Sequence, residues 1–163
     1  MSSVSVVPFE PRFAADFARL NYEWIEKYFA VEKHDREILD DPQKWVIEPG
    51  GEIFIALVDD VSAGTVALIP AENGSFELTK MAVSPEYQGR GLGDRLMEAC
   101  VEYAVTHRIH SVWLESHTKL TPALTLYRKF GFVEIPKDPN SLYSRADIRM
   151  ERTFHIEKSA PDM

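Results

Sequence analysis

The segment Gln88 to Asp94, with the sequence QGRGLGD, places three glycines in five positions just before a run with helical character. Glycine adopts backbone conformations that other residues avoid and has no side chain to block a ligand, so several backbone N–H groups can converge here. The first turn of a helix leaves about four N–H groups unpaired and carries about half a positive charge. The segment therefore predicts a binding site for an anion such as pyrophosphate, with Arg90 as a direct charge contact. Taken alone, the glycines also fit a plain strand-to-helix turn.

The spacing of these glycines differs from the two common nucleotide-binding fingerprints. No Lys-Ser or Lys-Thr pair follows them, as G-x-x-x-x-G-K-S/T requires, and G-x-G-x-x-G does not fit either. Nucleotide hydrolysis is therefore disfavoured.

The longer segment LTKMAVSPEYQGRGLGDRL closely resembles the acetyl-coenzyme A (acetyl-CoA) signature of the GNAT superfamily of N-acetyltransferases. That signature has the form Q/R-x-x-G-x-G/A after a strand and a proline-containing turn, and Gln88, Gly91 and Gly93 occupy its defining positions. A second segment, TPALTLYRKFGF, resembles the family's penultimate helix, with Tyr127 four residues before Gly131. The resemblance covers nearly the whole chain.

Three shorter segments, WIEKYF, LDDP and SRADIRME, are similar to acetyltransferase domains fused behind MarR-type transcriptional regulators. We expect a free-standing domain here, without the DNA-binding half. For such a domain, small-molecule amines are as plausible as protein acceptors.

The resemblance implies acetyl-CoA as co-substrate and requires no metal. The pyrophosphate is expected on the glycine segment, and the pantetheine arm is expected to pair with the end of the preceding strand like an added β-strand. A backbone N–H near Met81 or Ala82 would polarise the thioester carbonyl. His117 stands where related sequences often have an asparagine that touches the coenzyme arm, so we expect a cofactor contact there, with a second base as the alternative. The expected cofactor-binding residues are Met81, Ala82, Val83, Gln88, Gly89, Arg90, Gly91, Leu92, Gly93, Asp94, His117 and Tyr127.

For catalysis, the resemblance implies a general base and a general acid that act in a ternary complex. A protonated amine cannot attack a thioester, and the leaving thiolate of CoA has to gain a proton. Glu77 lies at the strand position where the family commonly keeps a glutamate, and we expect it to be the base. We expect Tyr127 to be the acid, because a neutral phenol with a pKa of about 10 can protonate a thiolate. The alternatives are a solvated strand-edge glutamate and a tyrosine that only packs in the core.

The expected function is direct transfer of the acetyl group from acetyl-CoA to a primary amine of a small molecule or peptide. The alternative is a catalytically weak CoA-binding sensor or scaffold module. Arg145 and Arg149 could hold a carboxylate of an amino-acid-like acceptor, whereas acidic side chains near the first helix would favour a polyamine-like one. Those acidic residues also fit a solvated helix face; they are Glu26, Glu32, Asp35, Glu37, Asp40 and Asp41.

Hydrophobic spacing and turn residues predict the elements that position these side chains. After a short strand at 4–9, apolar residues at spacings of three and four predict a helix over 11–29, and a short acidic helix over 35–40 follows. A loop that ends at Pro49-Gly50-Gly51 comes next. Asp59-Asp60 and Glu72-Asn73-Gly74 are typical turn sequences, so three antiparallel strands are expected between 52 and 83, with Glu77 on the third. A helix over 91–107, the strand SVWLES, a helix that Thr121 caps and Gly131 ends, and closing strands over 132–135 and 142–152 complete the chain. This order predicts an α/β (α+β) fold with a mixed, mostly antiparallel sheet of six or seven strands and helices on both faces. The family supplies the expectation that the sheet splays beside Glu77.

Composition limits the remaining possibilities. A chain of 163 residues with 45% hydrophobic side chains predicts a single domain, here 1–154, followed by a polar tail over 155–163. The net charge of −8 disfavours nucleic acid and anionic membrane surfaces as partners. Cys100 is the only cysteine and lies in a helical apolar pattern, so we expect it to pack in the core of a cytoplasmic protein, with a reactive thiol as the alternative. The oligomeric state stays open, with a homodimer as one option.

Overall fold

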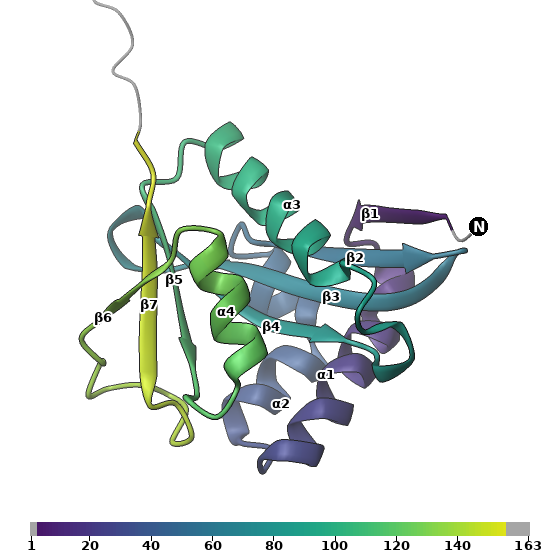
Figure 1. Ribbon diagram of the computed structural model, residues 1–163, viewed down its shortest axis with the longest axis horizontal. Coiled ribbons are helices and arrows are strands. Elements are labelled where there is room, and N and C mark those ends of the chain that lie inside the picture. The colour runs from purple at the N-terminus through teal and green to yellow at the C-terminus, as the bar shows by residue number, and fades with distance from the viewer. Residues whose placement is uncertain (1–2, 156–163) are drawn as a thin grey trace, which may run out of the picture.

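The computed structural model describes residues 3–155, which form one seven-stranded sheet with helices on both faces (Figure 1). The strand order is β1-β2-β3-β4-β5-β7-β6, and all neighbours are antiparallel except the parallel pair β4 and β5. The strands are β1 (Val4–Pro8), β2 (Glu52–Val58), β3 (Val61–Pro70), β4 (Phe76–Val83), β5 (Ser111–Ser116), β6 (Val133–Ile135) and β7 (Ile148–Thr153). The helices are α1 (Ala14–Tyr28), α2 (Lys33–Asp40), α3 (Leu92–Thr106) and α4 (Thr121–Lys129), with short turns η1 (Pro11–Phe13), η2 (Gln43–Ile47), η3 (Glu72–Gly74) and η4 (Pro85–Tyr87). The predicted fold class is confirmed.

Two hydrophobic cores hold the layers together. Side chains of a strand alternate between the faces of a sheet, so β2 sends Ile53 and Ile55 toward α1 and α2 and sends Ala56 toward α3. Phe17 and Ile25 of α1 are fully buried on the first face, and Leu96 and Met97 of α3 on the second. Burial of each such large side chain contributes about 1.5–3 kcal/mol, so both helical layers are firmly attached to the sheet.

Local turn chemistry behaves as predicted at both hairpins of the meander. Asp59 and Asp60 have φ of +48° and +68°, which suits the tight turn between β2 and β3. Asn73 and Gly74 likewise have positive φ in the turn before β4. The predicted helices over 11–29 and 91–107 also form, the first of them beginning with the short turn η1.

Three predictions about local structure are wrong. Thr121 is the first residue of α4 and not its N-cap, because the backbone N–H of Leu124 already donates to Leu120 at 3.0 Å and extends the helix by one residue. The strand expected over 142–152 begins only at Ile148. The residues before Ile148 bind α2 through side chains. Residues 43–47 form the π-helical turn η2 instead of the expected loop.

The predicted polar tail lies outside the described residues from 156 onward. Within residues 3–155, no helix is long and apolar enough to cross a membrane.

Candidate active site

A cleft opens where β4 and β5 separate. The two strands pair only at Phe76 with Val112 and at Glu77 with Trp113, and they run in different directions beyond this point (Figure 1). The end of α1 lies at one side of the cleft and α4 at the other. The predicted splay beside Glu77 is therefore present. Predicted site residues that line the cleft are Glu77, Met81, Ala82, Val83, Gln88, His117 and Tyr127.

Glu77 is the last residue of β4 that pairs with β5 before the cleft begins. Loss of contact with water raises the pKa of its carboxyl group from 4.5 to about 7, and the charge of Lys80 opposes this rise. Among the described residues, no hydrogen bond or ion pair to the Glu77 carboxylate is found. The Glu77 carboxyl therefore has a pKa of about 7 and oxygens that are available to a ligand. A general base requires both properties.

Tyr127 of α4 is buried at 8% exposure and lines the same cleft. Burial raises the pKa of its phenol to about 12, so the group stays protonated at neutral pH. Its ring also packs in the core near Phe132, with ring centroids 6.3 Å apart. Core packing and exposure to the cleft thus coexist in this residue.

The glycine segment leads directly into α3, as expected. Gly89 and Gly91 have φ of +81° and +77°, and Gly91 is the N-cap of α3 without a side-chain capping bond. The first helical hydrogen bond runs from the N–H of Arg95 to Gly91, so the N–H groups between them lack intrahelical partners. A Cβ atom at Gly89 or Gly91 would meet nothing within 4 Å, so backbone conformation is the reason for glycine there.

The third glycine has a different reason. A Cβ atom at Gly93 would lie 3.0 Å from Cδ2 of Leu126, so this glycine allows α3 to approach α4 closely. The carboxylate of Asp94 forms an ion pair with Lys129 of α4, which leaves its backbone N–H as the group that faces an anion. Arg90 is exposed, with its guanidinium over the ring of Tyr87 at 5.3 Å.

His117 lines the cleft with both ring nitrogens engaged. Nδ1 accepts a hydrogen bond from the N–H of Lys119 at 3.0 Å, and Nε2 lies 3.4 Å from Oδ2 of Asp147. A nitrogen that accepts a hydrogen bond carries no proton, which assigns the ring proton to Nε2. The ring is further packed near Phe29, with centroids 5.5 Å apart. This geometry favours a positioned contact residue over a second base.

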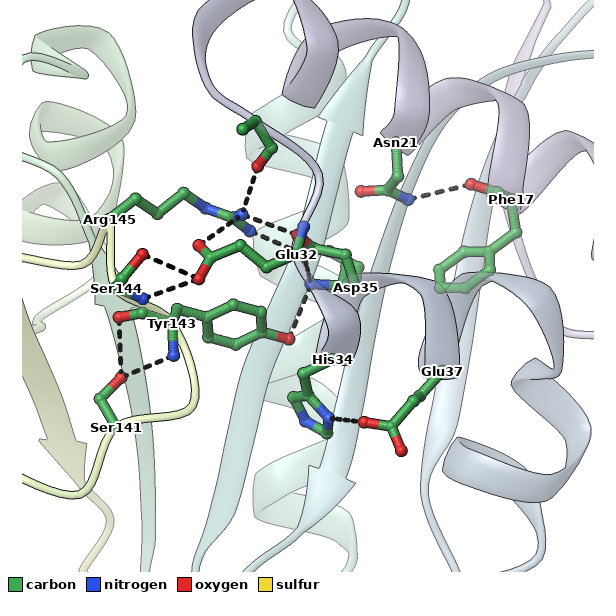
Figure 2. Close-up of polar contacts among 12 residues, drawn as sticks. Phe17, Asn21, Glu32, His34, Asp35, Glu37, Ser141, Tyr143, Ser144 and Arg145 are labelled. Carbon is green, nitrogen blue, oxygen red and sulfur yellow. Dashed lines mark hydrogen bonds and ion pairs between the residues drawn. The ribbon is translucent and has the colours of Figure 1, made fainter.

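A buried network of charges adjoins the cleft, and sequence reasoning missed it (Figure 2). Asp35 of α2 is fully buried, and its Oδ1 accepts hydrogen bonds from Lys80 Nζ and Arg145 Nη2, both at 2.7 Å. Its Oδ2 accepts from Arg145 Nη1 at 2.7 Å and from the N–H of Glu32 at 2.8 Å. Burial acts to raise the pKa of the Asp35 carboxyl, but the hydrogen bonds from Arg145 and the charge of Lys80 prevail and hold it far below its usual range.

This network changes both expectations for the acceptor. The acidic residues near α1 are neither a free wall nor a fully solvated face, because Asp35 is buried and Glu32 accepts a bond from Arg145 at 3.2 Å. Arg145 is bound to these carboxylates and lies in the loop before β7, so it is not a free strand residue that awaits a substrate. The one signal for the network in the sequence was Lys80, a charged residue inside the otherwise apolar end of β4.

Two further sequence expectations concern Cys100 and metal binding. Cys100 is buried at 2% exposure, and burial raises the pKa of its thiol, so the expected core role is confirmed. Within the described part of the chain, no group of three or more His, Cys, Asp or Glu side chains is arranged to hold a metal ion.

Residues 18–132 match the sequence profile of the Acetyltransferase (GNAT) family. An uncharacterized N-acetyltransferase of Schizosaccharomyces pombe is 29% identical over 156 residues, which cover 90% of this chain and 94% of that protein. Human N-acetylaspartate synthetase is 29% identical over 97 residues, 59% of this chain, and the match spans only 32% of that longer protein.

Solved structures share the whole fold. A GNAT-family acetyltransferase from Staphylococcus aureus Mu50 superposes with a TM-score of 0.83 at 17% identity, covering 93% of this chain and 99% of that one. The PaiA N-acetyltransferase of Thermoplasma acidophilum, solved in complex with coenzyme A, superposes with a TM-score of 0.70 at 18% identity over 93% of this chain and 99% of that one.

Proposed function

Because the chain belongs to the GNAT family of acetyltransferases, we propose that it transfers the acetyl group of acetyl-CoA directly to a primary amine in a ternary complex. Family membership confirms the predicted enzyme class, an N-acetyltransferase that uses acetyl-CoA. We propose the roles of the catalytic residues and the class of the acceptor. We also propose a cytoplasmic location, a single domain over 1–154 and no nucleic-acid or membrane partner.

The observation that carries the proposed mechanism is the placement of Glu77. Its carboxyl group lies at the point where β4 and β5 separate, and its pKa of about 7 makes it a base matched to neutral pH. Near pH 7 a large share of Glu77 is ionised and can accept the proton that an alkylammonium group must lose. A bound water can relay this proton where the amine does not touch the carboxylate.

Tyr127 is proposed to supply the second proton transfer. It lies in the cleft on α4, and its phenol remains protonated because burial raises its pKa to about 12. When the tetrahedral intermediate collapses, the C–S bond breaks and the phenol donates its proton to the departing thiolate. A solvent proton then restores the phenol.

We assign the acetyl-CoA site to the cleft and to the start of α3. The pyrophosphate would accept hydrogen bonds from the unpaired N–H groups over 91–94, where the helix dipole adds positive potential. Met81, Ala82 and Val83 line the cleft. Their backbone would pair with the pantetheine arm, and an N–H of this segment would stabilise the oxyanion.

The acceptor is proposed to enter through a second hollow, which is lined in part by His34 of α2. This hollow shares Glu77, Glu115 and Tyr143 with the cleft, so the proposed base can be reached from the cleft and from the hollow. The carboxylates that line this hollow outnumber its cations. They therefore favour an amine with more than one positive charge over an amino acid. The charged and titratable residues of this hollow are His34, Glu72, Glu77, Glu115, Asp138, Tyr143, Arg149 and Glu151.

Glu77→Gln tests the mechanism. We expect CoA affinity to persist while the rate falls by about 10²-fold at pH 7, with partial recovery at high pH where free amine is abundant. Glu102→Gln on α3 is a control outside the cleft and the hollow, since it also removes one carboxylate, and its rate should stay within about threefold of wild type. Wild-type rates in Glu77→Gln at neutral pH would refute the base assignment.

A screen of amines, amino acids and basic peptides, read by release of the CoA thiol, separates the enzyme from the alternative sensor. Turnover of at least one class is expected. Cofactor binding without turnover of any acceptor would favour the sensor module.

A further inference from the structure

β4 contains a bulge at Lys80. Two residues, Lys80 and Met81, lie opposite Val66 of β3, because Thr65 pairs with Ala82 and Ala67 pairs with Thr79. Lys80 has φ of +56°, in the left-handed region that non-glycine residues seldom occupy. Residues that follow this bulge line the cleft. A strained conformation therefore lies directly beside the proposed site of the thioester.

The side chain of Lys80 is fixed from two directions. It is buried, with 3% of the side chain exposed, and Nζ donates to Oδ1 of Asp35 at 2.7 Å and to the hydroxyl of Tyr143 at 2.9 Å. Its charge is balanced, since Asp35 and Glu32 oppose Lys80 and Arg145 in a closed set of two anions and two cations. A buried ion that is fully paired holds its geometry firmly, because any movement would leave a charge without a partner.

The network joins α2 to two segments that line the cleft, β4 and the loop before β7 (Figure 2). α2 contributes Asp35, β4 contributes Lys80, and the loop before β7 contributes Tyr143 and Arg145. Ser144 of that loop also donates to Glu32, through its N–H and its hydroxyl, both at 2.9 Å. The bulge is thus tied to both segments that border the acceptor side.

Lys80 also acts on the proposed base. The charged and titratable groups around Glu77 are Lys80 on β4, Glu115 on β5, Arg149 on β7, Tyr143 in the loop before β7 and His34 on α2. Among the charges, Lys80 has the largest effect on Glu77, and its positive charge favours the carboxylate. Lys80 thus connects the backbone of the bulge with the ionisation of Glu77.

We propose that Lys80 is a positioning residue for acetyl transfer: held by Asp35 and Tyr143, it keeps the β4 bulge in its left-handed conformation beside the proposed site of the thioester. Its charge has a second effect, since it favours the ionised form of Glu77. This inference rests on the proposed function. It predicts that the two effects of Lys80 can be separated by the choice of replacement.

The test compares Lys80→Met with Lys80→Gly. Both remove the ammonium group, but only glycine adopts positive φ without strain. In both variants the titration midpoint of Glu77, followed by carboxyl NMR and assigned with Glu77→Gln, should rise by about one pH unit. At a pH above that midpoint, kcat should fall in both variants, because both lose the ammonium group, and it should fall about tenfold further in Lys80→Met than in Lys80→Gly. Acetyl-CoA affinity, measured by calorimetry, should follow the same order.

Equal kcat in the two variants, or an unshifted midpoint, would overturn the inference. If Lys80→Met does not fold, Asp35→Asn/Lys80→Met keeps the remaining charges of Arg145 and Glu32 balanced, and the same readouts apply to it. The titration needs no substrate, so an unshifted midpoint counts against this inference alone. Absence of turnover in the wild-type protein with every amine would count against the proposed function instead.

Discussion

The negative charges of Glu77 and Asp35 both interact with Lys80. Even so, the pKa of the Glu77 carboxyl is raised and that of the Asp35 carboxyl is lowered. Asp35 accepts four hydrogen bonds, three of them from cationic groups, which stabilise its ionised form. Glu77 is partly shielded from water and has no such partners among the described residues, so its neutral form is favoured. The first carboxylate suits a structural role and the second suits proton transfer.

Tyr127→Phe tests the proposed acid. The variant keeps the ring and its packing, so the fold and the affinity for CoA should persist. We expect the rate to fall tenfold or more across the pH range without the alkaline recovery of Glu77→Gln, because the thiolate still lacks a proton donor.

Thioesters with a leaving group of lower pKa provide the control. They should partly rescue Tyr127→Phe and should give Glu77→Gln no special benefit, since only the tyrosine variant has difficulty in expelling the sulfur. A fully active Tyr127→Phe with the natural thioester would leave Tyr127 as a packing residue.

At the scale of elements, the start of α3 depends on backbone conformation more than on side chains. Gly89 and Gly91 provide positive φ, and Gly93 provides close contact with α4. The N-cap of α3 has no side-chain hydrogen bond, so the first N–H groups of the helix remain for a ligand. The same helix is anchored in the core through Leu96 and Met97, which fixes the direction of these groups.

Gly91→Val should weaken CoA binding by tenfold or more, since a β-branched residue disfavours positive φ and moves the N–H groups of the first turn. Gly74→Val is a matched control, because Gly74 also has positive φ, here +76°, and a Cβ atom there would likewise meet nothing within 4 Å. Both variants should lose about 1–2 kcal/mol of stability, but only Gly91→Val should lose affinity in calorimetry. Similar affinities in the two variants would argue against this phosphate site.

At the scale of the whole molecule, the proposed base should make stability depend on pH. The pKa of Glu77 is raised from 4.5 in the unfolded chain to about 7 in the folded one, so folding binds a proton between these values. The resulting stabilisation is complete below pH 4.5 and is lost as the pH rises through 7. The site thus works at the expense of stability in the range where it is active.

Urea unfolding of wild type and Glu77→Gln at pH 5 and pH 8 checks this prediction. The difference in free energy of unfolding between the two proteins should shift in favour of the variant by up to about 3 kcal/mol on going from pH 5 to pH 8, at about 1.36 kcal/mol for each pKa unit. A difference that does not change with pH would show that the pKa of Glu77 is not raised in the folded state.

The sequence by itself determined the features that nearby residues encode. The glycine spacing, the helical period of α1 and α3, the tight turns at Asp59 and Asn73, and the family motifs around Gln88 and Tyr127 are all local patterns. Period and turn chemistry predicted the fold class, because they depend on neighbours within a few positions. The family resemblance supplied the expectation of a splayed sheet and of some of the residues that line the cleft.

Only the tertiary structure decided the rest. Arg145 binds Asp35 across 110 residues of sequence, and Lys80 binds Tyr143 across 63, so no local pattern could pair them. The strand predicted over 142–152 gives way to these contacts at Tyr143 and Arg145, since a buried carboxylate has to find cationic partners wherever the fold brings them. The bulge at Lys80 and the raised pKa of Glu77 arise in the same way, because burial and nearby charge are properties of the packed chain and not of the residue type.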